Sequence, residues 1–235
     1  FWTAFWNDLK WTFFSLLGQL IVGFTGALAL NRIKKGSSIY RTILIIPWAI
    51  PSIVLAFSWK WILNGVYGFL PNLLIKLGLC STAPEFLTGN LAFATLVFIN
   101  IWFGSPLIMV NILSALQTVP KDQYEAAQID GANIFQRIFK VTIPCLVPTL
   151  IILTLLAVGN IFRGDFQMFY QLVGNNGPLF NATDVIDTFT FRSLIQSGEV
   201  GMSAAAGLYQ SVFCFITIVF TNFLVKRYDP DYSLF

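Results

Sequence analysis

Runs of about twenty apolar residues constrain this chain more than any other feature of its sequence. Five stretches qualify, at residues 12–31, 42–63, 91–116, 142–162 and 204–225. About 20 mostly apolar residues cross the hydrocarbon core of a bilayer as a helix. Each crossing must be helical, because lipid offers no partner to an unpaired backbone group. We therefore predict an all-α fold, a polytopic membrane helical bundle with five spans.

The composition supports a membrane protein and excludes some chemistry. Of the 235 residues, 56% are hydrophobic and only 11% are charged, whereas about a quarter of the residues in soluble domains are charged. The chain has no histidine, so a histidine metal site or a Ser-His-Asp triad within it is excluded. Cys80, Cys145 and Cys214 lie far apart without metal-ligand spacing. We expect these cysteines to pack as small apolar residues, and we predict no metal site.

The loops that carry lysine and arginine predict the direction of the spans. With alternating spans, nine of the fourteen basic residues fall on one side: Arg32, Lys34, Lys35, Arg41, Lys121, Arg137, Lys140, Lys226 and Arg227. We expect this side to be cytoplasmic. The N-terminus of this chain then lies outside and its C-terminus lies in the cytoplasm.

Two longer connections fall on the opposite side, at residues 64–90 and 164–203. The first holds an apolar run too short to span, and we expect a short helix at the outer interface. The second holds an amphipathic stretch from Val185 to Ile195. We expect a helix there, with Thr183 as its cap and Asp184 near its positive end.

The segment "QYEAAQIDGANIFQRIFKVTIP", residues 123–144, interrupts the apolar pattern on the cytoplasmic side. Pro120 suits a first helical turn, and Gly131 suits a stop. A second helix can begin near Asn133. Ala126 and Ala127 make the first helix thin enough for another protein to approach its backbone. The residues alone leave two interpretations open: an ordinary helix on the membrane surface, or a docking helix.

Glu125-Ala126-Ala127, followed by Gly131 and by Val141, Ile143 and Pro144, resembles the EAA signature of permease subunits in ATP-binding-cassette (ABC) importers. Val141 stands where isoleucine is usual, and Ile143 where leucine is usual. The longer form "YEAAQIDGA" resembles the sugar-importing branch. The resemblance implies that residues 118–142 form a cytoplasmic coupling loop. It implies that the loop contacts the ATPase through Tyr124, Glu125, Ala126, Ala127, Asp130 and Gly131. Within this set Asp130 is expected to help hold the turn.

Residues 40–225 resemble maltose-type permeases of type I importers more widely. The resemblance is carried by "YRTILIIPWAIPSIVLAFSWKWILNGVYGFLPNLL", "NIWFGSPLIMVNILSALQTVPKDQYEAAQIDGA" and "YQLVGNNGPLFNATDVIDTFTFR". Asn175 and Asn176 occupy places where glycine is common. Such permeases usually carry an extra leading span, and this chain opens on Phe1. We therefore expect residues 1–235 to be a single transmembrane permease domain whose leading span is missing.

Polar and aromatic residues are interleaved after the fourth predicted span, in "AVGNIFRGDFQMFYQ". Asn160, Arg163, Asp165 and Phe166 are our candidates for substrate binding, because sugars are held by hydrogen-bonding groups and aromatic faces. The alternative is an interfacial aromatic belt with snorkelling charges. Arg163 could pair with Asp165 or meet an acidic sugar.

The resemblance adds Gly104 as a substrate-binding candidate. Trp102-x-Gly104-x-Pro106 is similar to a motif near the sugar site of maltose-type permeases. Leu107 stands where that family has a tyrosine that can contact sugar, which suggests a different or differently held sugar.

The resemblance implies a transport subunit rather than an enzyme. It would form half of a pathway for a sugar or oligosaccharide delivered by an extracellular or periplasmic binding protein. The expected partners are a second homologous permease, two cytoplasmic ABC ATPase subunits and membrane lipid, with no nucleic acid. ATP and Mg would be bound by the ATPase subunits, because the chain lacks a G-x-x-x-x-G-K-[ST] sequence. No cofactor is expected in this chain, and the implied location is a bacterial plasma (inner) membrane.

Three alternatives stay open at this stage. The EAA loop reports the ATPase partner, so the cargo could be another small polar solute. A gradient-driven secondary transporter would be expected to show inverted repeats or ionisable residues near the midplane, and neither is evident. A structural membrane protein would not need the cytoplasmic motif.

Overall fold

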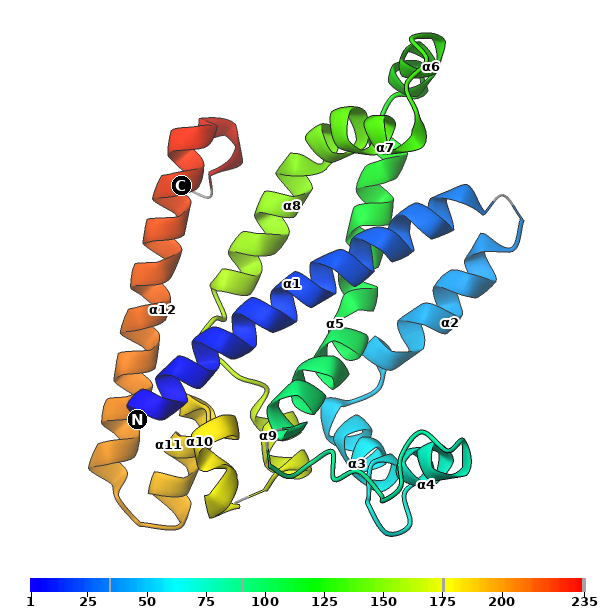
Figure 1. The fold of residues 1–235 in the computed structure, drawn as a ribbon. Coiled ribbons are helices and arrows are strands. Elements are labelled where there is room, and N and C mark those ends of the chain that lie inside the picture. The colour runs from blue at the N-terminus through cyan, green and yellow to red at the C-terminus, as the bar shows by residue number, and fades with distance from the viewer. Residues whose placement is uncertain (34, 90, 175, 234–235) are drawn as a thin grey trace.

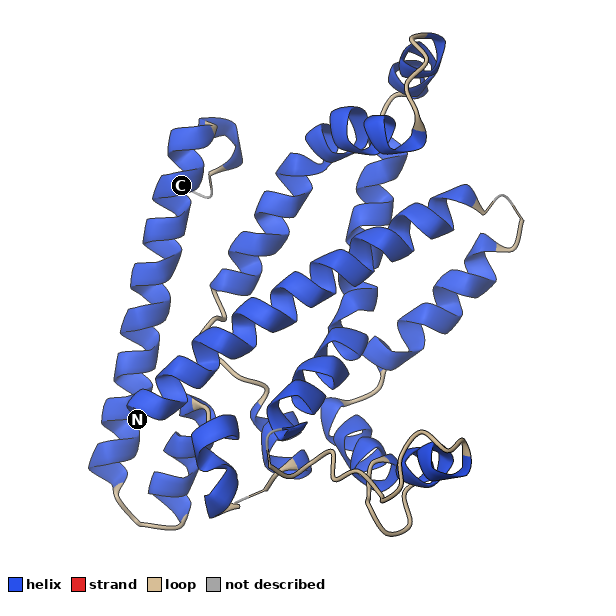
Figure 2. Cartoon of the chain, in the orientation of Figure 1, coloured by secondary structure: helices blue, strands red, loops and turns tan. Residues whose placement is uncertain are grey.

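The computed structural model describes residues 1–33, 35–89, 91–174 and 176–233. Every regular element in these ranges is a helix (Figures 1 and 2). In chain order the elements are α1 (Trp2–Arg32), α2 (Ser37–Ala49), α3 (Ser52–Ile62), α4 (Phe69–Lys76), α5 (Leu91–Thr118), α6 (Lys121–Ile129), α7 (Ile134–Arg137), the π-helix η1 (Ile138–Thr142), α8 (Ile143–Val158), α9 (Phe166–Leu172), η2 (Gly177–Leu179), α10 (Phe180–Thr183), α11 (Ile186–Ile195), α12 (Val200–Tyr228) and η3 (Pro230–Tyr232).

The helical bundle confirms the predicted fold class. Within the described residues, four helices are long and apolar enough to cross a membrane: α1, α5, residues 134–158 and α12. The pair α2 and α3 makes a fifth span if it is counted as one. The short helix expected in the first outer connection is α4, and the helix expected at Val185–Ile195 is α11.

The predicted span over 42–63 is present as a broken pair of helices. The structure breaks this span between α2 and α3, which meet at an angle of 92°. Ile50 has an extended backbone, with φ −84° and ψ 133°. The cause is local, because Pro51 lacks an N–H and disfavours helical geometry in the residue before it.

Two other spans begin earlier than their apolar runs. The first helix starts at Trp2 rather than at residue 12, and its added turns bury Asn7 and Asp8. The fourth span starts at Ile134, passes through η1 and ends at Val158 rather than at residue 162. In the first helix the added turns contain polar residues that bond to other parts of the protein, as Asn7 and Asp8 do.

The long helix α1 crosses the bundle diagonally and packs closely against α5 (Figure 1). One core cluster joins α1 to α5 and α8 and includes Ala27, Ile112 and Leu146. A second joins α1 to α3, α5 and α9 around Trp11 and Phe169, whose ring centroids lie 4.5 Å apart. A polar contact also joins α1 to α5, with Gln19 Nε2 donating to Asn100 Oδ1 at 2.6 Å.

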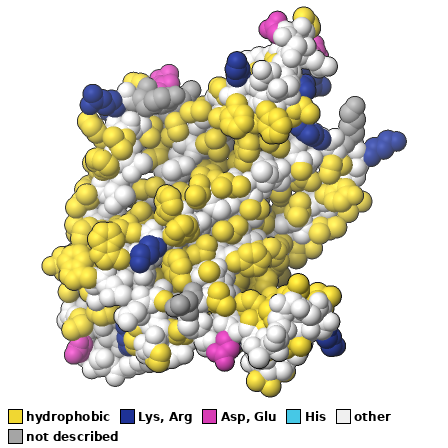
Figure 3. Space-filling view, in the orientation of Figure 1, with side chains coloured by type: hydrophobic (Ala, Val, Ile, Leu, Met, Phe, Trp, Pro, Cys, Tyr) yellow, Lys and Arg dark blue, Asp and Glu magenta, His cyan; other side chains and the backbone are white. Residues whose placement is uncertain are grey.

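The outer surface has the pattern of a membrane protein. Figure 3 shows a broad apolar band, with lysine and arginine side chains more numerous toward the end of the molecule that carries α6. Large apolar side chains are exposed along α12, including Leu208, Phe215 and Phe220. Lys34, one of the nine basic residues used to predict the orientation, lies outside the described residues.

Gly23 lets α1 and α5 approach, and this gives a stability prediction. A Cβ at Gly23 would lie 2.8 Å from Ile108 Cγ2 and 3.1 Å from the Met109 backbone nitrogen. We expect Gly23→Ala to lower the thermal unfolding midpoint, with a cost of roughly 1–3 kcal/mol from overpacking. Gly207→Ala in α12 is the control, because nothing lies within 4 Å of its Cβ position. Equal midpoints for the two purified variants would contradict the packing role.

Candidate functional site

The predicted coupling helix is α6, which projects beyond the bundle at one end (Figure 1). Glu125 and Ala126 are exposed, Tyr124 and Ala127 are half-buried, and Ile129 is 86% exposed. The helix begins after Pro120, as predicted, and buries none of its residues. A short helix that leaves a charge, two alanines and a large apolar side chain uncovered has the surface of a docking element.

Backbone hydrogen bonds fix the turn after α6. The Gly131 N–H donates to the Gln128 carbonyl at 3.1 Å, and the Ala132 N–H donates to the Ala127 carbonyl at 2.9 Å. This pair of bonds is the Schellman pattern, which needs a left-handed residue, and Gly131 has φ +77°. The predicted stop at Gly131 is confirmed. Asp130 is the exposed C-cap residue. The hydrogen bonds recorded in this turn join backbone groups.

Two side-chain contacts tie α6 to the next span. The Tyr124 hydroxyl lies 3.1 Å from Thr142 Oγ1 in η1, and the Cys145 thiol donates to Gln123 Oε1 at 3.2 Å. Cys145 is exposed and hydrogen-bonded, so the expectation that it packs as an apolar residue is wrong. Sequence analysis missed Gln123, Thr142 and Cys145, since only the folded loop brings them beside α6.

The second helix begins at Asn133, as predicted. Its side chain accepts from Gln136 N, and Gln136 Oε1 accepts from Asn133 N, both at 2.8 Å. This reciprocal capping box satisfies two otherwise unpaired donors. The π-helix η1 follows directly, and π turns inside helices are often found at functional sites. Thus three features connect α6 to the fourth span: the left-handed turn at Gly131, the capped start of α7 at Asn133, and the π turn of η1.

The predicted substrate residues Asn160, Arg163, Asp165 and Phe166 lie together between α8 and the first turn of α9. Asn160 Nδ2 donates to the Leu156 carbonyl at 3.1 Å, and Asp165 Oδ1 accepts from Met168 N at 3.0 Å as the cap of α9. Phe166 stacks on Tyr170 with centroids 5.3 Å apart. Arg163 is exposed.

Gly104, the fifth candidate, lies on α5 in close contact with the Gln19 side chain of α1. A Cβ at this position would meet the Gln19 amide. The structure gives Gly104 a helix-packing role, and its assignment to substrate binding stays a prediction. Asn175 lies outside the described residues, and Asn176 is the N-cap of η2.

Arg163 forms no recorded ion pair with Asp165 among the described residues, and its charge lies near Asp187 of α11. Among the described residues the recorded ion pair is Arg192 with Asp184, at 2.7 Å. Burial raises the pKa of Asp187, while the Gln210 amide, which donates to Asp187 Oδ1 at 2.8 Å, and the Arg163 charge oppose that rise. Burial likewise raises the pKa of Asp165. The charged residues of the turn between α8 and α9 therefore lie close enough to Asp187 of α11 to influence its ionisation.

The start of α1 holds this outer connection in place. Asn7 Nδ2 donates to the Asp184 carbonyl at 3.0 Å, and Thr12 Oγ1 donates to the Ile161 carbonyl at 2.7 Å. Asp8 is fully buried, and its Oδ2 accepts from Ile186 N, at the first residue of α11, at 2.9 Å. Asp8 therefore caps a helix 178 residues away.

Thr183 does not cap α11, so that prediction is wrong. It ends α10, where its hydroxyl donates to the Leu179 carbonyl at 2.9 Å. Asp184 does lie near the start of α11, and its Oδ1 accepts from Thr188 Oγ1 at 2.8 Å.

These features define a multi-pass membrane protein with an exposed short helix projecting at one end and a braced connection at the other. Residues 5–230 match the family described as binding-protein-dependent transport system inner membrane component. The chain belongs to this family, which confirms the permease family predicted from the EAA segment.

Named relatives agree with the family. The chain is 34% identical over 232 residues to the trehalose/maltose transport system permease protein MalF of Thermococcus litoralis, covering 98% of this chain and 76% of that protein. It is 29% identical over 224 residues to the inner membrane ABC transporter permease protein YcjO of Escherichia coli K12, covering 94% of this chain and 74% of that one.

A solved structure has the same fold. The crystal structure of a bacterial ABC transporter involved in the import of the acidic polysaccharide alginate contains a chain that matches with a TM-score of 0.88 and 27% identity, covering 97% of this chain and 79% of that chain. The relatives are permeases rather than enzymes, and the family is one of inner-membrane components.

The contact between Asp8 and α11 gives a second prediction. Asp8→Ala leaves the buried Ile186 N–H without an acceptor, at a cost of about 1–3 kcal/mol. We expect faster hydrogen exchange in the first turn of α11 and a lower thermal midpoint. Asp8→Asn keeps an amide oxygen as acceptor and should retain most of the protection. If the alanine variant protects α11 as well as wild type does, the capping role is refuted.

Proposed function

We propose that this chain is the permease subunit of an ATP-driven importer of a sugar or oligosaccharide, forming half of the translocation pathway. The observation that carries the proposal is the exposed EAA helix, α6, built as a docking element and tied to the fourth span by Tyr124 and Gln123. Membership of the binding-protein-dependent transport family supports it.

In this proposal the end that carries α6 is cytoplasmic, as the loop charges favour. Two ABC ATPase subunits bind there and supply ATP and Mg, with α6 in a groove of one of them. Glu125 contacts the ATPase, and Ala126, Ala127 and Gly131 allow the close fit. The membrane is a bacterial inner membrane, and Phe1 lies on its outer side.

A second, homologous permease completes the pathway, and an extracellular or periplasmic binding protein delivers cargo to the outer connections. In support, a solved complex of the alginate transporter includes an alginate pentasaccharide-bound periplasmic protein, and its matching chain has a TM-score of 0.88 and 27% identity. The outer connection of the present chain, braced by Asp8 and Asn7, offers a fixed platform for such a protein.

The cargo has two candidate classes. The relative from Thermococcus litoralis is named for trehalose and maltose, which favours a neutral disaccharide. The structural likeness to an alginate importer, together with the exposed Arg163 beside the candidate turn, favours an acidic oligosaccharide. A guanidinium binds a carboxylate through two parallel hydrogen bonds.

The complete transporter, with its binding protein, tests the function and separates these classes. Neutral and acidic oligosaccharides are tested one at a time, and we expect ATP hydrolysis to rise with the sugar that is the cargo. If acidic sugars stimulate, Arg163→Gln should abolish that stimulation and Lys10→Gln, which removes a charge elsewhere on the outer side, should not. Co-purification without an ATPase, combined with uptake that follows an ion gradient, would overturn the proposal in favour of a secondary transporter.

Charge reversal at the docking helix tests coupling. We expect Glu125→Lys to abolish uptake while the membrane domain still folds, because like-charge or unpaired contacts at an interface cost several kcal/mol. Glu85→Lys makes the same change in the outer connection and should leave the ATPase association intact. Uptake and ATPase rates in proteoliposomes provide the readout. Normal uptake by the Glu125→Lys transporter would refute the assignment of α6.

A further inference from the structure

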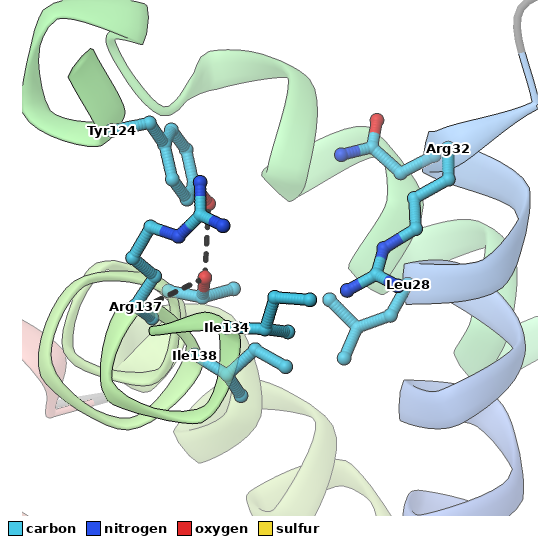
Figure 4. A pocket seen from close by; sticks show the side chains of 8 residues that line it. Leu28, Arg32, Tyr124, Ile134, Arg137 and Ile138 are labelled. Atoms are coloured by element: carbon cyan, nitrogen blue, oxygen red, sulfur yellow. Dashed lines mark hydrogen bonds between the residues drawn. The ribbon is translucent and has the colours of Figure 1, made fainter. Parts of the chain in front are cut away.

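A cavity of about 410 Å³ opens between the last turns of α1 and the helix that follows the coupling loop (Figure 4). It joins α1 to a segment, α6 to η1, that is about ninety residues away in the sequence. The residues that matter to its chemistry are Leu28 and Arg32 of α1, Tyr124 of α6, Ile134 and Arg137 of α7, and Ile138 of η1.

The cavity is apolar in its middle and positively charged at its sides. Figure 4 shows Arg32 and Arg137 on opposite sides, with the aliphatic side chains of Leu28, Ile134 and Ile138 between them. No acidic side chain is among the described residues that line it. A site of this kind suits a ligand that carries a negative group next to a hydrocarbon portion.

Arg137 has unused hydrogen-bonding capacity. Its Nε is buried and has no hydrogen-bond partner. Across the described ranges neither Arg137 nor Arg32 forms an ion pair, since the recorded one joins Arg192 and Asp184. A buried donor without a partner is costly, and a guanidinium matches the oxygens of a phosphate group in a two-pronged geometry. An anion between the two arginines would neutralise two positive charges that have no ion-pair partner among the described residues.

The surroundings point to lipid as the source of that anion. Next to Arg137, Phe135 is 72% exposed and Phe139 is 65% exposed. Exposed aromatic side chains alternating with Arg137 and Lys140 are typical of a segment that lies in a membrane interface. The proposed orientation places this segment at the cytoplasmic leaflet, where anionic lipids attract basic residues.

We propose that this cavity binds one anionic glycerophospholipid of the inner leaflet. Its phosphate lies between Arg32 and Arg137, and an acyl chain runs along Leu28, Ile134 and Ile138. The lipid thereby bridges α1 to the helix that carries the coupling loop. It holds the spacing of α6 relative to the bundle. This consequence and the choice of the inner leaflet rest on the proposed function, whereas the binding of an anionic lipid does not.

The test is native mass spectrometry of the complete, delipidated transporter, titrated with phosphatidylglycerol, with phosphatidylcholine of the same chain length, and with glycerol phosphate. We expect tight binding of phosphatidylglycerol only. Arg32→Gln and Arg137→Gln should each weaken it about fivefold, and the double variant on the order of 25-fold, from about 1 kcal/mol for each basic residue near the surface.

Two controls keep the outcome interpretable. Lys226→Gln with Arg227→Gln removes the same charge from the end of α12 and should leave the affinity unchanged. Arg32→Lys with Arg137→Lys retains both charges and should bind within about fivefold of wild type, which excludes misfolding as the cause of the loss.

Three results would overturn the lipid site: unchanged phosphatidylglycerol binding in the double glutamine variant, equal binding of phosphatidylcholine, or glycerol phosphate binding as tightly as the lipid, which would indicate a soluble phosphate ligand instead. Loss of sugar-stimulated ATP hydrolysis with lipid binding intact would count against the proposed function and not against this site.

Discussion

Every backbone polar group inside a bilayer must find a partner within the protein, and this constraint decides where the present chain can bend. Lipid tolerates helix and little else. At two departures from α-helix in the described chain, side chains of α1 supply the missing hydrogen bonds. Thr12 donates a hydrogen bond to the Ile161 carbonyl, and Asp8 accepts one from the Ile186 N–H. The departures at residues 130–133, 138–142 and 159–165 are also where the candidate functional residues gather.

The helix α1 connects these departures. Its first turns contact the outer connection through Asn7 and Asp8, its middle packs on α5 at Gly23, and its last turns face the coupling loop across the cavity lined by Arg32. A single helix therefore runs from the outer connection to the cavity beside α6, while α6 itself contacts η1 of the fourth span.

Local chemistry explains how much of this the sequence could predict. The spans, the glycine stop at Gly131 and the helix start at Asn133 follow from nearby residues, and the structure confirms them. The 92° break at Pro51 had a local signal too, but its size depends on the packing of α3 against α9. The cap that Asp8 gives to Ile186, and the contact of Gly104 with Gln19, join distant residues, so no pattern in one segment could predict them. For the same reason Thr183 was assigned to the wrong helix.

The π turn at Ile138–Thr142 carries one residue more per turn than the α-helix on either side. Recovering α geometry there would change the helical register by one residue, which corresponds to a rotation of about 100° and an axial step of about 1.5 Å. Thr142, which contacts Tyr124, lies at the end of this turn. The contact between α6 and the fourth span is therefore made at the turn whose register differs from that of the α-helices on either side, so a change of register there would rotate the fourth span relative to α6.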